Sequence, residues 1–181
     1  MNTAYRSGAA VRYPMLLNAA LFQLGWWACI LLAANGWPVL ALLALALIVA
    51  IHVLTRAAPM RALVLVVACL AIGALVESIM VAAHFIAYPP TAIAWNGVPP
   101  WMIGLWGLLS TTLGTSLRWL SGHVWLGVAF GAAGGALAYD AGAHLGALRL
   151  PSPWSLWSVA VVWGAALPGL LMLARGWEGG R

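Results

Sequence analysis

Long apolar runs, interrupted by prolines, glycines and single arginines, make up most of this chain of 181 residues. Hydrophobic residues account for 65% of the sequence and charged residues for 6%, whereas a soluble domain carries about 25% charged residues. So little charge cannot cover a surface that faces water. The chain is therefore predicted to fold within a lipid bilayer, as a single domain over residues 1–181.

The apolar runs predict helices that span this bilayer. A helix needs about 20 apolar residues to cross roughly 30 Å of hydrocarbon, and hydrocarbon offers no partner for loose backbone polar groups. The predicted fold class is an all-α, polytopic bundle of six transmembrane helices. Their expected ranges are 14–34, 38–55, 61–86, 100–117, 122–147 and 154–174. The first run is longer than the apolar core of a signal peptide, so we expect it to be retained.

The arginines are distributed unevenly around these predicted spans. If the N-terminus is cytoplasmic, seven of the eight arginines fall in cytoplasmic segments and only Arg149 falls on the opposite side. Cytoplasmic loops carry such an excess of basic residues, so both termini are predicted to lie in the cytoplasm. The arginines are dispersed singly and form no basic stripe, which argues against nucleic acid as a partner.

Glu77 is one of only three acidic residues, and it lies inside the third predicted span. An ionisable group in a bilayer is costly unless it faces protein or water, which makes it a candidate for function. His84 follows seven residues later, on the same helical face and about 10 Å further along the axis. The two side chains could line one cavity or hold opposite ends of one bound group.

Asp140 and His144 form a second polar pattern, in the fifth predicted span. Their i, i+4 spacing allows the carboxylate to accept a hydrogen bond from the imidazole, which could orient a general base or supply half of a metal site. Counting residues from the cytoplasmic side places Asp140 and Glu77 at a similar depth, in the outer half of the membrane. We therefore predict one catalytic site formed by Glu77, His84, Asp140 and His144.

Two other interpretations of these residues remain open. Glu77 could be protonated and hydrogen-bonded within the bundle, and Asp140 could pair with Arg149. Asp140 and His144 could also lie in the interfacial zone, where water solvates them. Metal binding is left open because no local ligand motif such as HExxH is present, and the sequence identifies no cofactor. Cys29 and Cys69 form no CxxC pair and are expected to be small buried hydrophobes.

Small residues recur at intervals of four in the fifth span, at Gly127, Gly131 and Gly135. Such a ridge lets two helix backbones approach closely. It predicts tight packing within the chain, with homo-oligomerisation through the same three glycines as the alternative. Polar residues elsewhere in the spans, including Asn18 and Gln23, are expected to bridge helices rather than to catalyse.

Three segments resemble a known family. NAALFQLGWWACIL (18–31), PPWMIGLWGLLSTTLGTSLRWL (99–120) and GGALAYDAGAHLGAL (134–148) are similar to small bacterial inner-membrane proteins that are catalogued as a domain of unknown function. The resemblance implies a multi-pass protein of the bacterial inner membrane. It also implies a gene neighbourhood shared with fatty-acid-modifying proteins, which favours lipid as the substrate class. The family supplies no catalytic residues that could be transferred to this chain.

Three classes of function are consistent with these observations. The first is a membrane-embedded enzyme or accessory factor that acts on a lipid or isoprenoid through the acid/His cluster, with the carboxyl groups as acid or base. The second is a small proton-coupled transporter that uses the same carboxyl groups as titrating sites. The third is a non-catalytic membrane subunit whose polar residues bind partner helices.

Overall fold

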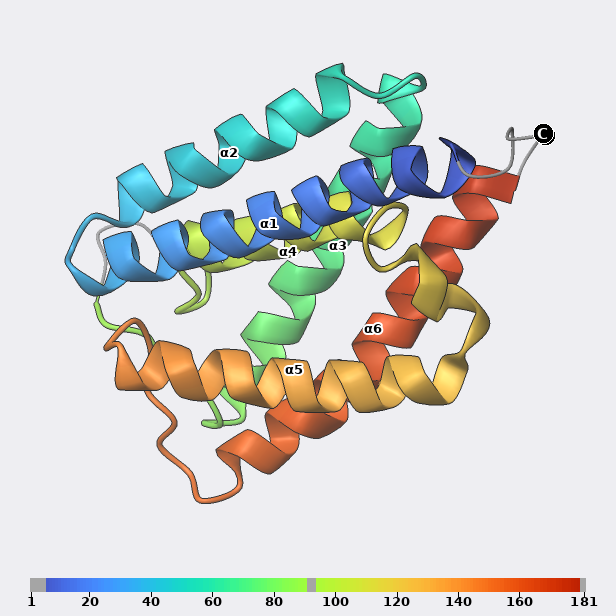
Figure 1. Ribbon diagram of the computed structural model, residues 1–181. Coiled ribbons are helices and arrows are strands. Elements are labelled where there is room, and N and C mark those ends of the chain that lie inside the picture. The colour runs from blue at the N-terminus through green and yellow to red at the C-terminus, as the bar shows by residue number, and fades with distance from the viewer. Residues whose placement is uncertain (1–5, 91–93, 180–181) are drawn as a thin grey trace.

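The computed structural model describes residues 6–90 and 94–179, and this part of the chain is helical without a β-strand. Six α-helices and one 3-10 helix follow one another along the chain (Figure 1). They are α1 (Arg6–Ala34), α2 (Pro38–Leu54), α3 (Pro59–Ala82), α4 (Pro100–Leu113), η1 (Arg118–Gly122), α5 (Val124–His144) and α6 (Ser155–Gly179). The all-α prediction is confirmed, and each predicted span corresponds to one α-helix.

Four of these helices are long and apolar enough to cross a membrane: α1 from Met15, α3, α5, and α6 as far as Trp177. The other two are shorter. α2 has 17 residues and α4 has 14, which at 1.5 Å per residue gives about 26 Å and 21 Å. The chain is therefore a helical membrane protein, whereas the crossing of all six helices and their orientation remain predictions.

Three helices end earlier than their sequence patterns predict, and each end has a local cause. α4 stops at Leu113 rather than 117 because the chain turns at Gly114, before η1. α3 stops at Ala82 and α5 at His144, although apolar residues continue for several positions. In both of these helices the next residue but one, His84 or Gly146, has a positive φ, of 58° and 85° respectively.

A Schellman motif closes both α3 and α5. After α3, the Phe85 amide donates to the Met80 carbonyl and the His84 amide to the Val81 carbonyl. After α5, Gly146 occupies the corresponding left-handed position. Glycine adopts this conformation without steric strain, whereas histidine does so at a cost of about 1–2 kcal/mol. His84 thus ends a helix, and apolar content alone does not reveal that end.

The helix connections gather at two ends of the bundle (Figure 1). The end that we call the terminal end holds the start of α1, the turn at 55–58, η1 and the end of α6. The opposite end, which we call the loop end, holds residues 35–37, the described residues between α3 and α4 (83–90 and 94–99), and residues 145–154. At the loop end, a short antiparallel bridge between Ala87 and Arg149 links the segment after α3 to the segment after α5.

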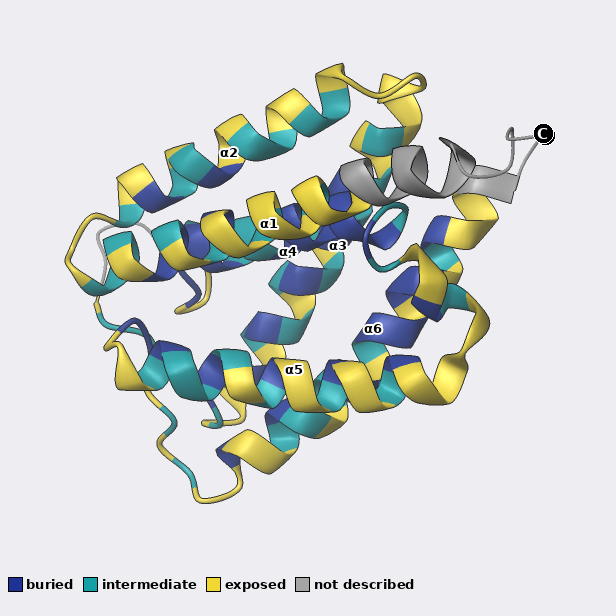
Figure 2. Ribbon diagram, in the orientation of Figure 1, coloured by how far each residue is buried: buried dark blue, intermediate teal, exposed yellow. Residues whose placement is uncertain are grey.

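Helix α4 occupies the centre of the bundle. It packs against α1, α2 and α3, and it also contacts α6, while α5 packs most extensively on α6. Ten of its fourteen residues are buried. Figure 2 shows the opposite pattern on the outward faces of α1, α2 and α5, where exposed residues dominate. Many of these are large and apolar, such as Leu24 and Leu47, as is expected of a surface that contacts lipid.

The glycine ridge of α5 packs within the chain. Gly127, Gly131 and Gly135 are all buried and face α6. A Cβ atom on Gly131 would lie 2.3 Å from the Trp163 carbonyl oxygen, and one on Gly135 would lie 2.4 Å from the Trp163 ring. This is the packing within the chain that the spacing predicts. Homo-oligomerisation through these glycines stays a prediction, and it would require α6 to move away from the ridge.

Candidate functional site

The carboxyl group of Glu77 is completely buried and lies at the junction of three helices. Its Oε1 atom accepts hydrogen bonds from the Trp106 indole nitrogen, at 3.1 Å, and from the Tyr139 hydroxyl. Its Oε2 atom accepts a hydrogen bond from the Tyr88 hydroxyl at 2.7 Å. One carboxyl group therefore connects α3 to α4, to α5 and to the segment that follows α3.

The local sequence of α3 positions this cluster. Gly73 lies one helical turn before Glu77, on the same face of the helix. A Cβ atom on Gly73 would lie only 2.3 Å from the Trp106 ring. The missing side chain therefore lets the indole rest directly on the α3 backbone. In that position the Trp106 N–H reaches the carboxyl group one turn further on.

Tyr88 connects the cluster to the loop end. It follows the residue that pairs with Arg149, and its ring meets the Trp101 ring edge-on, with the centroids 5.8 Å apart. Burial, together with the neighbouring Glu77 carboxyl group, raises the pKa of Tyr88 well above its ordinary value. The hydroxyl therefore keeps its proton and remains available as a hydrogen-bond donor.

The hydrogen bonds of Glu77 limit the chemistry that it can perform. Three partners occupy the two carboxyl oxygens, and no part of the residue is exposed. A general acid or base must lie within hydrogen-bond reach of the proton it transfers. Without rearrangement of a tyrosine or of Trp106, a substrate cannot reach Glu77. The geometry favours a positioning role, in which the carboxyl group holds three aromatic side chains in place.

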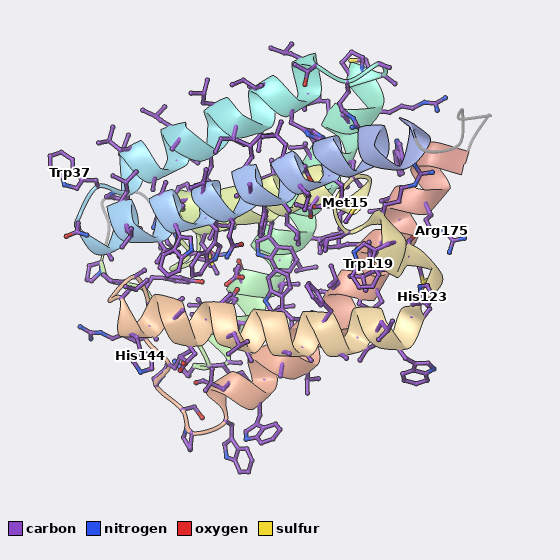
Figure 3. The ribbon with its side chains drawn as sticks, viewed as in Figure 1. Met15, Trp37, Trp119, His123, His144 and Arg175 are labelled. Atoms are coloured by element: carbon purple, nitrogen blue, oxygen red, sulfur yellow. The ribbon has the colours of Figure 1, made fainter. Side chains whose placement is uncertain are left out.

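The other three predicted site residues lie elsewhere. His84 is exposed at the left-handed position that ends α3. The side chain of Asp140 is 43% exposed and that of His144, the last residue of α5, is 77% exposed; Figure 3 shows His144 at the loop end. The two side chains lie close together, with His144 Nδ1 3.5 Å from Asp140 Oδ2, but the hydrogen bond of the imidazole is to the Asp140 backbone carbonyl oxygen, at 2.9 Å, and not to the carboxylate as predicted.

The four predicted site residues therefore do not form one cluster in this structure. Asp140 lies beside Tyr139 in sequence, but it is Tyr139 that points inward and reaches Glu77. Within the described residues, no group of three or more His, Cys, Asp or Glu side chains is arranged to hold a metal ion. The prediction that Glu77 meets this part of α5 is correct, but the residue that reaches Glu77 is Tyr139 and not its neighbour Asp140.

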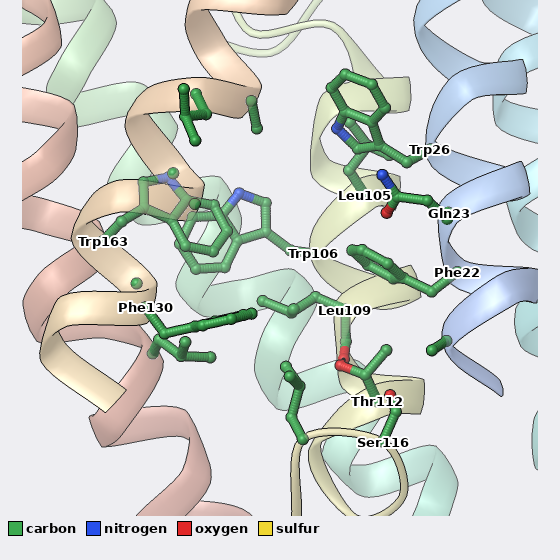
Figure 4. A pocket seen from close by; sticks show the side chains of 18 of the residues that line it. Phe22, Gln23, Trp26, Leu105, Trp106, Leu109, Thr112, Ser116, Phe130 and Trp163 are labelled. Carbon is green, nitrogen blue, oxygen red and sulfur yellow. The ribbon is translucent and has the colours of Figure 1, made fainter. Parts of the chain in front are cut away.

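An apolar groove lies next to the Glu77 cluster, between α1 and α5 (Figure 4). Its volume is about 630 Å³. α1 forms one side and α5 the other, while α4 and α6 form the inner wall. None of the residues that line the groove carries a charged side chain. The bundle thus has a hollow of ligand size, since small-molecule pockets measure roughly 300–1,000 Å³.

Aromatic rings form the inner wall of this groove. Trp106 and Trp163 stack with their centroids 4.7 Å apart and their planes at 25°. Tyr139 meets Trp163 edge-on beside them. Trp106 and Tyr139 both line the groove, and both donate hydrogen bonds to Glu77 behind the wall. Glu77 therefore shapes the groove without being exposed in it.

Polar contacts lie at the terminal end of the groove. Met15 and Trp119 line it there and are labelled in Figure 3. Asn18 of α1 donates to the Thr111 carbonyl oxygen at 3.2 Å and accepts from the Ser116 hydroxyl at 2.8 Å. These bonds join α1 to the end of α4, so the prediction that Asn18 bridges two helices is confirmed. By contrast, the hydroxyl of Thr111 bonds within its own helix.

Sequence reasoning missed Tyr88, Trp106 and Tyr139. Each of the three has a large aromatic ring with a single polar hydrogen, and such residues are common in membrane proteins, so the sequence does not single them out. A signal was nevertheless available: a carboxyl group inside a span needs donors, and tryptophan, with 12 residues, is the commonest side-chain donor in this lysine-free chain. Only the crossing of the helices decides which of them reach Glu77.

Comparison with protein families gives one match. The model of the family described as "Protein of unknown function (DUF2878)" matches residues 15–169, from the α1 span to α6. That range includes Glu77, its three partners and the residues that line the groove. No curated protein and no solved structure matched the chain.

Proposed function

This chain belongs to the DUF2878 family, and we propose that it is a multi-pass membrane protein that binds the hydrocarbon chain of a lipid or isoprenoid in the groove between α1 and α5. Under this proposal it lies in a bacterial inner membrane with both termini in the cytoplasm. The groove is the observation that carries the proposal. It is flanked by two helices that are apolar enough to span a membrane, so its surroundings are hydrocarbon.

The chemistry of the lining supports a hydrocarbon chain as the occupant. Apolar side chains and tryptophan rings face the groove, and charged side chains are absent from its lining. Ligand sites typically combine such an apolar wall with a few placed polar groups. A segment of lipid chain would gain dispersion contacts with the Trp106–Trp163 wall, while its remainder extends into the surrounding bilayer.

The position of Glu77 favours a binding or accessory role over catalysis. Its carboxyl group is separated from the groove by Trp106 and Tyr139. An enzymatic or proton-coupled role would require that wall to open. A second candidate, docking of a helix from a partner protein, is favoured by the position of the groove on one side of the bundle between two helices. The two candidates predict different crosslinks: a lipid in the first case and a second polypeptide in the other.

The proposal can be tested with a photoreactive alkyl diazirine lipid in membranes that contain the protein. We expect crosslinks at groove residues such as Phe22, Leu109 and Phe130. Gly134 lines the groove, and a Cβ atom there would meet nothing within 4 Å, so Gly134→Leu would fill the groove without disturbing the helices. This variant is expected to lose most of the groove crosslinks.

Gly169→Leu is the matched control, because Gly169 is also helical and open to a new Cβ atom but lies outside the groove lining. It should crosslink like the wild-type protein. Crosslinks confined to outward residues such as Leu43 and Leu47, unchanged in Gly134→Leu, would show that lipid only surrounds the bundle. Crosslinks from the groove to a second polypeptide would instead support the partner helix.

A further inference from the structure

Gln23 places an amide in the apolar groove without a protein partner. The residue lines the groove and is exposed, and no described residue forms a hydrogen bond with its side chain. Figure 4 shows the amide between Phe22 and Trp26, directed from α1 into the hollow. The amide of Asn18, a little more than one turn earlier in the same helix, by contrast bonds to Thr111 of α4 and to Ser116 just after α4.

The depth of Gln23 makes an unpaired amide unfavourable. The candidate span of α1 runs from Met15 to Ala34, which places Gln23 about 12 Å from one end and about 16 Å from the other. An amide side chain is too short to reach the interface from there. A polar group left without a hydrogen bond in an apolar environment costs roughly 1–3 kcal/mol. The amide should therefore find its partner in whatever occupies the groove.

Trp26 adds a second donor at the same edge. It follows Gln23 by three residues, so the two side chains share a helical face. Its indole nitrogen is directed into the groove beside the amide (Figure 4). Together they offer three N–H donors, two on the amide nitrogen and one on the indole, and one carbonyl acceptor. An alkyl chain satisfies none of these groups, whereas a hydroxyl or carbonyl oxygen on a lipid can accept from the donors.

We propose that the groove selects an oxygenated lipid, one whose hydroxyl or carbonyl oxygen binds the amide of Gln23 while its hydrocarbon chain lies against Trp106 and Trp163. This inference rests on the proposed lipid-binding function and adds the chemical class of the ligand. A second copy of this chain could also supply a partner for the amide, so the test includes that outcome.

The test is competition against the alkyl diazirine lipid, with groove crosslinks quantified by mass spectrometry. Hexadecanol, methyl palmitate and hexadecane all contain a 16-carbon chain. Hexadecanol carries a hydroxyl group, methyl palmitate carries an ester group, and hexadecane has no oxygen. The wild-type protein should prefer the two oxygenated probes over hexadecane by roughly two- to tenfold, as expected for one net hydrogen bond. Gln23→Leu should lose this preference and keep its response to hexadecane.

Leu24→Gln is the matched control, because Leu24 is 66% exposed, lies next to Gln23 and is outside the groove lining. It adds an amide on the lipid-facing surface while Gln23 stays in place, and it should retain the preference. Equal competition by all three probes in the wild type, or an unchanged preference in Gln23→Leu, overturns the inference. So does a wild-type dimer that Gln23→Leu converts to monomer, since the amides would then pair with each other. If hexadecane and both oxygenated probes all fail to compete, the lipid-binding function itself is wrong.

Discussion

Glu77 links several parts of the bundle interior through its carboxyl group. Its three partners come from α4, α5 and the segment after α3, so loss of the carboxyl group affects several contacts together. Gly73 contributes by admitting the Trp106 ring. His84, which the sequence presents as a possible companion of Glu77, instead acts through its backbone to end α3.

Removal of the Glu77 carboxyl group should destabilise the protein strongly. Glu77→Leu leaves three buried donors without an acceptor, and each unsatisfied group costs about 1–3 kcal/mol, so we expect a loss of at least about 3 kcal/mol. In Glu77→Gln the amide oxygen still accepts from Trp106 and Tyr139, and the Tyr88 hydroxyl can turn to accept from the amide nitrogen. The loss should then be about 1 kcal/mol.

The free energy of unfolding in mixed micelles, followed by circular dichroism, measures this difference. Leu75→Ala is a suitable control, since Leu75 lies on α3 close to Glu77 but is 63% exposed. The structural role assigned to Glu77 is wrong if Glu77→Leu unfolds at the same denaturant concentration as the wild type.

At the level of helices, α5 and α6 approach each other closely. The Gly131 and Gly135 positions bring the α5 backbone against Trp163, and Trp163 in turn stacks on Trp106 in the groove wall. The packing of this helix pair therefore sets the position of one side of the groove. The distinction between a buried and an open glycine on the same helix gives a direct test.

Gly131→Ala is expected to destabilise the protein by about 1–3 kcal/mol, because its methyl group would overlap the backbone of α6. Gly134→Ala meets open space and should be neutral, or stabilising by up to about 1 kcal/mol through helix propensity. Unfolding free energies measured alongside sedimentation velocity separate packing from assembly. A Gly131→Ala protein that stays folded but changes from dimer to monomer would contradict the intramolecular role of the ridge.

For the whole molecule, the two ends of the bundle differ in their connections and in their arginines. The turn at 55–58 and η1 lie at the terminal end, together with Arg56, Arg118 and Arg175, whereas Arg149 lies at the loop end (Figure 1). An excess of arginine marks the cytoplasmic side of a membrane protein. This arrangement supports the proposal that the terminal end faces the cytoplasm.

Single introduced cysteines can test that orientation. Ala57→Cys at the terminal end and Pro153→Cys at the loop end both replace exposed residues, and the native Cys29 and Cys69 are buried and should give little background. In intact cells, a membrane-impermeant thiol reagent should label position 153 and leave position 57 unlabelled until the membrane is opened. The reverse labelling pattern would show that the protein is inserted the other way round.

The approximate positions of the six α-helices could be predicted from the sequence, because apolar runs and helix-breaking residues are local features. Pro38, Pro59 and Pro100 each begin a helix, as their fixed φ angle favours. The membrane setting follows from a composition too poor in charge for a water-facing surface. The importance of Glu77 was also predictable, since a carboxyl group within a span requires partners wherever it lies.

Tertiary structure alone decided which partners Glu77 has and where a ligand can bind. Tyr139 and Asp140 are adjacent, and the rotation of α5 turns the tyrosine inward and leaves the aspartate at the surface. The groove exists because α1 and α5 pack mainly on other helices and not on each other. A hollow lined by side chains therefore lies between them. Helix rotation and crossing depend on contacts between residues far apart in the chain, and these contacts have no local signature in the sequence.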